Sequence, residues 1–196
     1  MKIIFLDRDG VINKFPGRGD YVTKVKSFRF LPGALKALKE LTQNGFTIFV
    51  ISNQAGVSRG VYSQDKLNCI NRYMLKKVNK SGAKIKKVFY CTHTREHNCN
   101  CRKPKIGSII EALRLVNKKL SAAKDTFFIG DADMDIEAGK RAGCTTIAVL
   151  SGRSKRREIN SWRIKPDCIT KNLLEAVRII NHENSCCSHL CRGRSH

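Results

Sequence analysis

The sequence predicts an α/β fold: a three-layer, Rossmann-like, doubly wound and mostly parallel sheet with helices on both faces. Two observations predict it. Short apolar runs rich in Ile, Val and Phe alternate along the chain with segments whose apolar residues follow a helical period. Polar or acidic residues also follow several of the apolar runs directly, as they do where parallel strands end at a ligand crevice.

The first strand is expected at Lys2–Leu6, which holds Ile, Phe and Leu without a turn residue and leads straight into Asp7. Each later strand is expected at a comparable apolar run with a polar or glycine boundary. These runs are Phe46–Ser52, Lys87–Thr92, Thr126–Gly130, Thr145–Leu150 and Asp167–Thr170.

Helices are expected between the strands. Pro32 begins the first and Gly45 ends it, and Ser63 is placed to cap the second, which runs to Gly82. Residues 106–120, 136–142 and 173–180 carry the remaining helical patterns, with Asp133 as the expected N-cap of the 136–142 helix. The basic stretch 152–165 has no clear period and is expected to be turn-like.

The length of 196 residues suits one domain, which we expect at 1–180, followed by a disordered tail at 181–196. No apolar run reaches the ~18 residues that a membrane span needs. The start of the chain also lacks the pattern of a signal peptide, so we expect a cytoplasmic protein. Nine cysteines then favour thiols or metal ligands over disulfides.

The formal net charge of +22, from 38 basic and 16 acidic residues, is high for this length. Such a field attracts anions, including phosphorylated metabolites and nucleic acid. A lysine-rich solvated surface is the simpler explanation of most of the charge. Against this basic background, the acidic residues that cluster near strand ends stand out.

Polar residues follow three of the predicted strands, and their carboxyl ends should meet at one edge of the sheet. Asp7 and Asp9 follow the first strand, Ser52-Asn53-Gln54 end the second, and Asp131, Asp133 and Asp135 follow the fourth. Arg102 and Lys103 lie in a loop between them. Carboxylate oxygens suit Mg²⁺, and a cation beside a carboxylate nucleophile suits phosphoryl transfer.

The segments DRDGV, SNQ, RKP and GDADMD occur in this order, and together they resemble the haloacid dehalogenase-type phosphatases. The resemblance implies Mg²⁺-dependent hydrolysis through an aspartyl-phosphate. It implies that Asp7 is the nucleophile and Asp9 the general acid and base. It also implies that Asp7, Asp131 and the main-chain carbonyl of Asp9 hold the Mg²⁺, with Asp135 supporting the metal ligands.

The same resemblance implies how the phosphoryl group is bound. Ser52 and Asn53, with Gln54 beside them, would contact its oxygens, and Lys103, helped by Arg102, would stabilise its charge. The segment between Asp9 and Ser52 leaves little room for a cap domain. We therefore expect an open, capless site that is covered by short loops or by a partner subunit. A monomer is the expected state of the protein.

A second signal is CTHTREHNCNC, in which Cys91, His93, Cys99 and Cys101 have the spacing C-x-H-x₅-C-x-C. Three thiolates and an imidazole suit a closed tetrahedral Zn²⁺ site, which is structural because it leaves no position for water. His97 breaks the spacing and is not expected to bind. The tail offers a rival set, which we expect to be metal-free: Cys186, Cys187, His189 and Cys191.

This loop followed by CRKP resembles the branch of heptose-bisphosphate and histidinol-phosphate phosphatases. SNQAGVSRG is similar to the heptose enzymes, which implies removal of the 7-phosphate of D-glycero-D-manno-heptose 1,7-bisphosphate. The short zinc loop is closer to the histidinol-phosphate enzymes, and Ala132 stands where heptose enzymes usually carry Lys. A second phosphate could find other cations, namely Arg18, Arg59, Arg102, Lys103 and Lys105.

Three alternatives stay open at this point. One is a histidinol-phosphate phosphatase. Another is a polynucleotide 3′-phosphatase, which the charge favours and the lack of aromatic residues for base stacking disfavours. The third is a non-enzymatic, zinc-stabilised module that binds nucleic acid, which leaves Asp7, Asp9 and Asp131 unexplained. We expect a small phosphorylated sugar, rather than nucleic acid or a membrane, as the partner.

Overall fold

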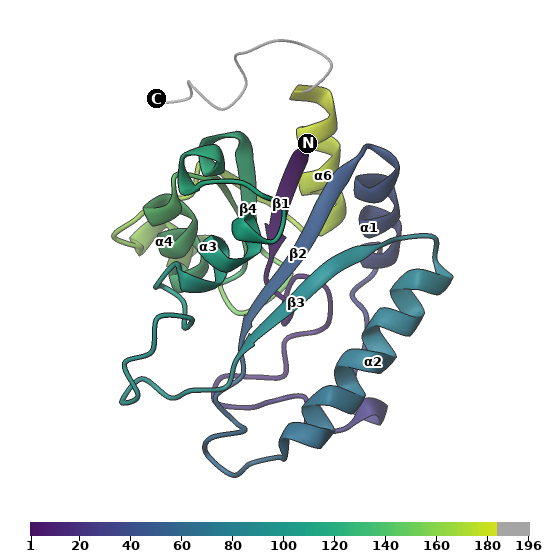
Figure 1. The fold of residues 1–196 in the computed structure, drawn as a ribbon, viewed down its shortest axis with the longest axis vertical. Coiled ribbons are helices and arrows are strands. Elements are labelled where there is room, and N and C mark those ends of the chain that lie inside the picture. Colours follow the sequence, from purple (N-terminus) through teal and green to yellow (C-terminus); the bar gives the residue numbers. More distant parts are fainter. Residues whose placement is uncertain (184–196) are drawn as a thin grey trace.

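The computed structural model describes residues 1–183 and shows a three-layer α/β fold around a six-stranded parallel sheet (Figure 1). The strand order is β3-β2-β1-β4-β5-β6, and every neighbouring pair is parallel. The strands are β1 (Lys2–Leu6), β2 (Phe46–Asn53), β3 (Ile85–Cys91), β4 (Thr126–Gly130), β5 (Thr145–Val149) and β6 (Cys168–Thr170).

Helices cover both faces of the sheet. Three of them, α1 (Ala34–Gln43), α2 (Gln64–Lys80) and α6 (Leu173–Glu183), lie on one face, and α3 (Gly107–Arg114) and α4 (Asp133–Ala142) lie on the other (Figure 1). The short helix α5 (Arg156–Ser161) follows β5.

Side chains along β1 alternate between the two apolar cores. Ile4 and Leu6 belong to the core beneath α1, α2 and α6, while Ile3 and Phe5 belong to the core beneath α3 and α4. The central strand is therefore buried on both faces, as parallel strands require. The packing on both faces therefore fixes the carboxyl end of β1, and with it the position of Asp7.

The predicted fold class is confirmed, and all six predicted strands form. Ser63 also caps α2 as predicted, accepting a hydrogen bond from the Lys66 amide at 3.3 Å. The bounds of the helices differ more. Helix α3 ends at Arg114, a 3-10 helix follows at Leu120–Asp125, and α6 continues to Glu183.

Two local predictions were wrong. The stretch 152–165 contains α5, which begins where Glu158 accepts a hydrogen bond from the Lys155 amide at 2.7 Å. Asp133 is not the N-cap of α4, because it is already the first residue of the helix. The N-cap is Ala132, whose amide donates to Asp135 at 3.1 Å.

The predicted metal-free tail, with Cys186, Cys187, His189 and Cys191, lies outside the described residues. The division into a domain at 1–180 and a tail stays a prediction. Within residues 1–183, none of the helices combines the length and apolarity needed to cross a lipid bilayer.

Candidate functional site

Three carboxylates meet at the carboxyl edge of the sheet, as the sequence predicts. Asp7 follows β1, Asp131 follows β4, and Asp135 lies in the first turn of α4. One carboxylate oxygen from each lies within 4.8 Å of the others, and all three residues are buried. The Asp7 amide donates to the Ile129 carbonyl at 2.9 Å, so the paired strands fix where this cluster forms.

Glycines make room for the Asp131 carboxylate. A Cβ on Gly10 would lie 2.0 Å from Asp131 Oδ2, and one on Gly152 would lie 1.9 Å from it. The Arg153 amide donates to the same oxygen at 2.5 Å. Sequence reasoning missed Gly152 because it lies far along the chain, and a single glycine after a strand usually marks only a turn.

Lys103 is the cation inside this cluster. Its Nζ lies 2.8 Å from Asp7 Oδ1 and 2.6 Å from Asp135 Oδ1, and it donates to the Ile51 carbonyl at 2.7 Å. Burial lowers the pKa of Lys103, but the carboxylates of Asp135 and Asp7 outweigh this and hold it above its usual value. The ammonium therefore stays charged although the residue is only 3% exposed.

One ammonium does not balance three buried carboxylates. Burial raises the pKa of Asp7 to about 6, against the opposing effect of Lys103. Burial and the neighbouring carboxylates of Asp7 and Asp135 also hold the pKa of Asp131 well above its usual range. Three converging oxygens with unbalanced negative charge fit a small, hard divalent cation such as Mg²⁺.

The Asp9 carboxylate is not part of this cluster, although Asp9 lines the same cavity. It accepts hydrogen bonds from Arg8, Asn13 and Gln54, and its side chain is 15% exposed. No role was predicted for Arg8, which is fully buried. It is instead a buried partner of Asp9.

The residues of the SNQ segment take two different positions, at the cavity wall and beneath it. Asn53 exchanges hydrogen bonds with the Lys103 main chain at 3.1 Å in both directions, which ties the end of β2 to the RKP segment. Ser52 and Asn53 both line the cavity described below. Gln54 is 1% exposed and is absent from the cavity wall, so its expected contact with substrate must be corrected to a position beneath the site.

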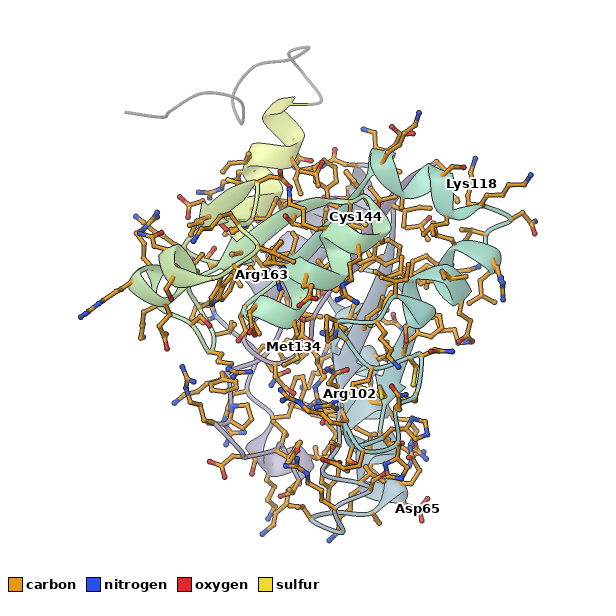
Figure 2. The ribbon with its side chains drawn as sticks, turned by 90° about the vertical axis from the view of Figure 1, so that its left-hand side faces the viewer. Asp65, Arg102, Lys118, Met134, Cys144 and Arg163 are labelled. Atoms are coloured by element: carbon orange, nitrogen blue, oxygen red, sulfur yellow. The ribbon has the colours of Figure 1, made fainter. Side chains whose placement is uncertain are left out.

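A cavity of about 510 Å³ opens above the carboxylates. Segment 15–21 and the loop residues Arg95 and Glu96 form its walls, as expected for a site covered by short loops. Figure 2 labels Arg102 and Met134, which both line it. Five arginines contribute to the wall: Arg18, Arg59, Arg95, Arg102 and Arg153.

Two of these arginines, Arg95 and Arg153, were not predicted, because only the fold brings their loops to the site. The prediction that Lys105 is available for a second phosphate must be corrected in the opposite direction. Lys105 is not among the residues that line this cavity, and its Nζ donates to the Asn98 carbonyl at 2.8 Å. Arg18 lines the cavity but is ion-paired with Glu158 of α5.

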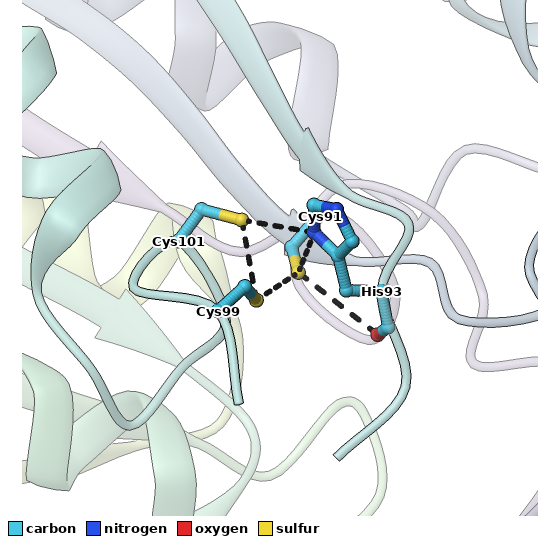
Figure 3. A group of neighbouring side chains, drawn as sticks. All are labelled: Cys91, His93, Cys99 and Cys101. Atoms are coloured by element: carbon cyan, nitrogen blue, oxygen red, sulfur yellow. Dashed lines mark hydrogen bonds between the residues drawn. The ribbon is translucent and has the colours of Figure 1, made fainter. Parts of the chain in front are cut away.

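The four predicted Cys and His residues come together at the end of β3 (Figure 3). Cys99 Sγ lies 3.6 Å from Cys91 Sγ and 3.5 Å from Cys101 Sγ, and His93 Nδ1 lies 3.8 and 3.4 Å from the sulfurs of Cys91 and Cys101. A tetrahedral zinc with Zn–S bonds of ~2.3 Å places its sulfurs roughly 3.8 Å apart, so the cluster fits such a site.

His97 lies outside this Cys/His cluster. Its Nδ1 lies 2.8 Å from the Thr94 hydroxyl, within hydrogen-bond distance.

Burial and the thiols of Cys101 and Cys99 raise the pKa of Cys91 to about 12. A cation among the sulfurs would favour the thiolate instead.

Known proteins resemble this chain along most of its length. The HAD-hydrolase-like family model matches residues 100–176. The D-glycero-beta-D-manno-heptose-1,7-bisphosphate 7-phosphatase of Neisseria meningitidis serogroup A is 36% identical over 187 residues, covering 94% of this chain and 97% of the relative. The D-glycero-alpha-D-manno-heptose-1,7-bisphosphate 7-phosphatase of Campylobacter jejuni is 34% identical, covering 79% and 85%.

A crystal structure of D,D-heptose 1,7-bisphosphate phosphatase from B. bronchiseptica, complexed with magnesium and phosphate, superposes with a TM-score of 0.83. It is 28% identical and covers 93% of this chain and 99% of its own. The agreement of fold, motif order and near full-length similarity identifies the family. The chain belongs to the haloacid dehalogenase-like hydrolases, among the D-glycero-D-manno-heptose-1,7-bisphosphate 7-phosphatases.

Proposed function

We propose that this chain is a Mg²⁺-dependent phosphatase that removes the 7-phosphate of D-glycero-D-manno-heptose 1,7-bisphosphate. The observation that carries the chemistry is the buried cluster of Asp7, Asp131 and Asp135 with Lys103 inside it, at the floor of a cavity rich in arginine. The substrate is proposed from the similarity to the Neisseria and Campylobacter enzymes.

Each residue has its own role in the two steps of the reaction. A carboxylate oxygen of Asp7 attacks phosphorus, which forms an aspartyl-phosphate and breaks the bond to the sugar oxygen. Asp9 gives that oxygen a proton. Asp9 then removes a proton from water, which attacks the aspartyl-phosphate, releases phosphate and restores Asp7. Lys103, Ser52 and Asn53 bind the oxygens of the phosphoryl group.

Asp7, Asp131 and the Asp9 carbonyl would hold Mg²⁺, with Asp135 beside them. When bound, the cation neutralises charge on the phosphoryl oxygens and lowers the repulsion between two anions. The high pKa of Asp7 without metal is consistent with such a role, because burial and its acidic neighbours leave its negative charge poorly compensated.

The remote 1-phosphate would bind the arginines of the wall. Arg59, Arg95 and Arg102 line the cavity together with Arg153. Each charge-assisted hydrogen bond contributes roughly 1.5–3 kcal/mol, and part of that binding energy positions the reacting end. The monophosphate that lacks the 1-phosphate should therefore have a lower kcat/KM.

A panel of phosphate esters tests the proposal. Both anomers of the heptose bisphosphate are assayed with Mg²⁺, beside histidinol phosphate and a 3′-phosphorylated oligonucleotide. For at least one anomer, we expect a kcat/KM ten-fold or more above the values for the other two substrates. Activity should be lost in Mg²⁺-free buffer. A better rate on histidinol phosphate or the oligonucleotide would overturn the substrate, and full activity without divalent cation would overturn the mechanism.

We also infer that Cys91, His93, Cys99 and Cys101 bind one Zn²⁺ with a structural role. The sulfur and nitrogen positions support a tetrahedral site with no place for water. Cys101 directly precedes Arg102, whose Nη1 donates to the His93 carbonyl at 3.1 Å. Zinc would therefore order the segment that carries Arg102 and Lys103 into the cavity.

Metal analysis of the full-length protein tests this assignment. We expect one zinc per chain in the wild type and none in Cys99→Ala, because loss of one thiolate removes a quarter of the ligands. A matched triple variant, Cys186→Ala with Cys187→Ala and Cys191→Ala, should keep its zinc. The reverse result, with zinc lost from the triple variant and kept by Cys99→Ala, would move the site to the tail.

A further inference from the structure

A series of hydrogen bonds runs from the buried Tyr62 to Asp9. The Tyr62 hydroxyl donates to Gln54 Oε1 at 2.6 Å, and Gln54 Nε2 donates to Asp9 Oδ2 at 2.7 Å. The same nitrogen donates to the Ser52 hydroxyl at 3.1 Å. Tyr62 and Gln54 are 3% and 1% exposed, and neither lines the cavity. Their hydrogen bonds therefore reach the site through Asp9 and Ser52.

The groups at the two ends of this series, Tyr62 and Asp9, fix which atom donates each hydrogen bond. Burial raises the pKa of Tyr62, so its phenol keeps the proton and remains a donor. The amide oxygen of Gln54 must face that donor, which leaves both hydrogens of the amide nitrogen for Asp9 and Ser52. The Gln54 main-chain amide donates to the Cys91 carbonyl at 2.7 Å, which fixes the base of the side chain to β3.

Asp9 is held from its other side as well. Arg8 Nε lies 3.2 Å from Asp9 Oδ1 and Nη2 lies 2.9 Å from Oδ2, while Asn13 Nδ2 donates to Oδ1 at 2.8 Å. These partners leave the carboxylate plane little freedom to rotate. Gln54 is the member of this set that also contacts Ser52, so it sets the distance between Asp9 and the end of β2.

The position of Tyr62 depends on Gly56. A Cβ on Gly56 would lie 2.6 Å from Tyr62 Cε1 and 2.8 Å from Tyr21 Cδ2. The rings of Tyr62 and Tyr21 pack at 5.9 Å between centroids. The phenol is therefore clamped between the turn after β2 and the segment that covers the cavity, and its hydroxyl is directed at Gln54.

We propose that Tyr62, acting through Gln54, is a positioning residue for Asp9. The hydrogen bonds from Tyr62 through Gln54 hold the Asp9 carboxylate where it can transfer a proton to the sugar oxygen that leaves phosphorus. The proposal rests on the acid and base role proposed above for Asp9. Neither Tyr62 nor Gln54 contacts the reacting atoms.

Dependence on the leaving group separates this role from a structural one. A sugar alkoxide is a poor leaving group and needs a proton from Asp9, whereas p-nitrophenolate leaves without one. The value of kcat/KM reports only the steps up to release of the leaving group. A misplaced Asp9 should therefore lower kcat/KM for the sugar phosphate and spare that for p-nitrophenyl phosphate.

The test compares Tyr62→Phe with wild type on both substrates. The variant keeps the ring and its packing and removes only the hydroxyl. We expect kcat for the heptose bisphosphate to fall about 10-fold with KM changed less than about 2-fold, because positioned proton transfer contributes about 100- to 10,000-fold. The kcat/KM for p-nitrophenyl phosphate should stay within about 2-fold of wild type.

Gln54→Leu should lose more on the sugar phosphate, about 50-fold, because it removes the donor to Asp9. Its loss on p-nitrophenyl phosphate should be much smaller and should come only from the hydrogen bond to Ser52. Tyr73→Phe is the matched control, because Tyr73 of α2 packs on Phe28 and does not line the cavity. It should behave as wild type. Equal losses on both substrates for Tyr62→Phe, or no loss on either, would overturn the positioning role.

Asp9→Asn separates failure of this inference from failure of the proposed function. If Asp9 is the general acid, Asp9→Asn should lose far more kcat/KM on the sugar phosphate than on the aryl phosphate. Should Asp9→Asn reduce both equally, its acid role fails, and the positioning role fails with it. Should Asp9→Asn be selective while Tyr62→Phe and Gln54→Leu are not, the positioning role alone is refuted.

Discussion

Replacing Asp7 by asparagine is expected to reduce kcat/KM for the heptose bisphosphate by about 1,000-fold or more, which corresponds to a loss of roughly 4 kcal/mol of transition-state stabilisation. Asparagine fills the same space but has no carboxylate oxygen that can attack phosphorus. Steady-state kinetics with Mg²⁺ would measure the loss. Turnover within ten-fold of wild type would contradict the covalent role of Asp7.

The same variant should be more stable than wild type when Mg²⁺ is absent. Burial raises the pKa of Asp7 to about 6 from 3.8, so the folded protein binds its proton more tightly than the unfolded chain does. The stability of the wild type therefore falls as pH rises from about 4 to about 6, by roughly 3 kcal/mol for this group. Asparagine has no proton to lose and escapes this penalty.

Urea denaturation in Mg²⁺-free buffer would measure the difference. The free energy of unfolding of Asp7→Asn should exceed that of wild type at pH 7, and the gap should close towards pH 4. Chelators must be left out, because they would also remove the Zn²⁺ that we propose for the Cys/His cluster. A variant that is less stable than wild type at pH 7 would show that Asp7 is well compensated without metal.

The fold and the core of this site could be predicted because both depend on local patterns. Strands as apolar as β1 must be buried on both faces, and parallel strands send their carboxyl ends to the same edge. Asp7 and Asp131 were therefore expected at the same edge of the sheet once the strands were recognised. The Cys/His cluster was predictable for a similar reason, since its four members lie close together in the sequence.

What could not be predicted depends on contacts between distant segments. Arg153 and Gly152 reach the site only because β5 lies beside β4, and no local pattern in their loop indicates a function. Gln54 and Arg8 look like exposed polar residues in the sequence, yet the fold buries both against Asp9. Helix α5 is short and holds a single apolar residue, Ile159, so its sequence shows no helical period.

The second large effect is expected from Lys103→Met, which keeps the length of the side chain and removes its charge. Loss of a cation that would contact the phosphoryl group should lower kcat/KM by at least about 100-fold, in line with other charge-stabilising groups in active sites. Without Mg²⁺ at pH 7, the variant should also lose about 3 kcal/mol of stability, because buried carboxylates are left without a counter-charge.

Lys140→Met is the matched control for burial. Lys140 is ion-paired with Asp167 at 2.5 Å, but both side chains are about one-third exposed, 34% and 32%. Water screens such a pair, so its loss should cost less than about 1 kcal/mol. Urea denaturation of both variants under one set of conditions measures the difference, and equal losses would mean that the carboxylates around Lys103 are not destabilised by burial.

The double variant Asp7→Asn with Lys103→Met identifies the source of the effect. Lys103 Nζ lies 2.8 Å from Asp7 and 2.6 Å from Asp135, so it compensates two carboxylates at once. Removing one of them should make the loss of Lys103 less costly, and the double variant should be more stable than Lys103→Met alone. If the two substitutions are additive instead, the cost of Lys103→Met comes from packing and from its bond to the Ile51 carbonyl. A coupling of 1 kcal/mol or more, within the range of about 0.5–3 kcal/mol seen for residues in contact, would show that the cluster is held by charge.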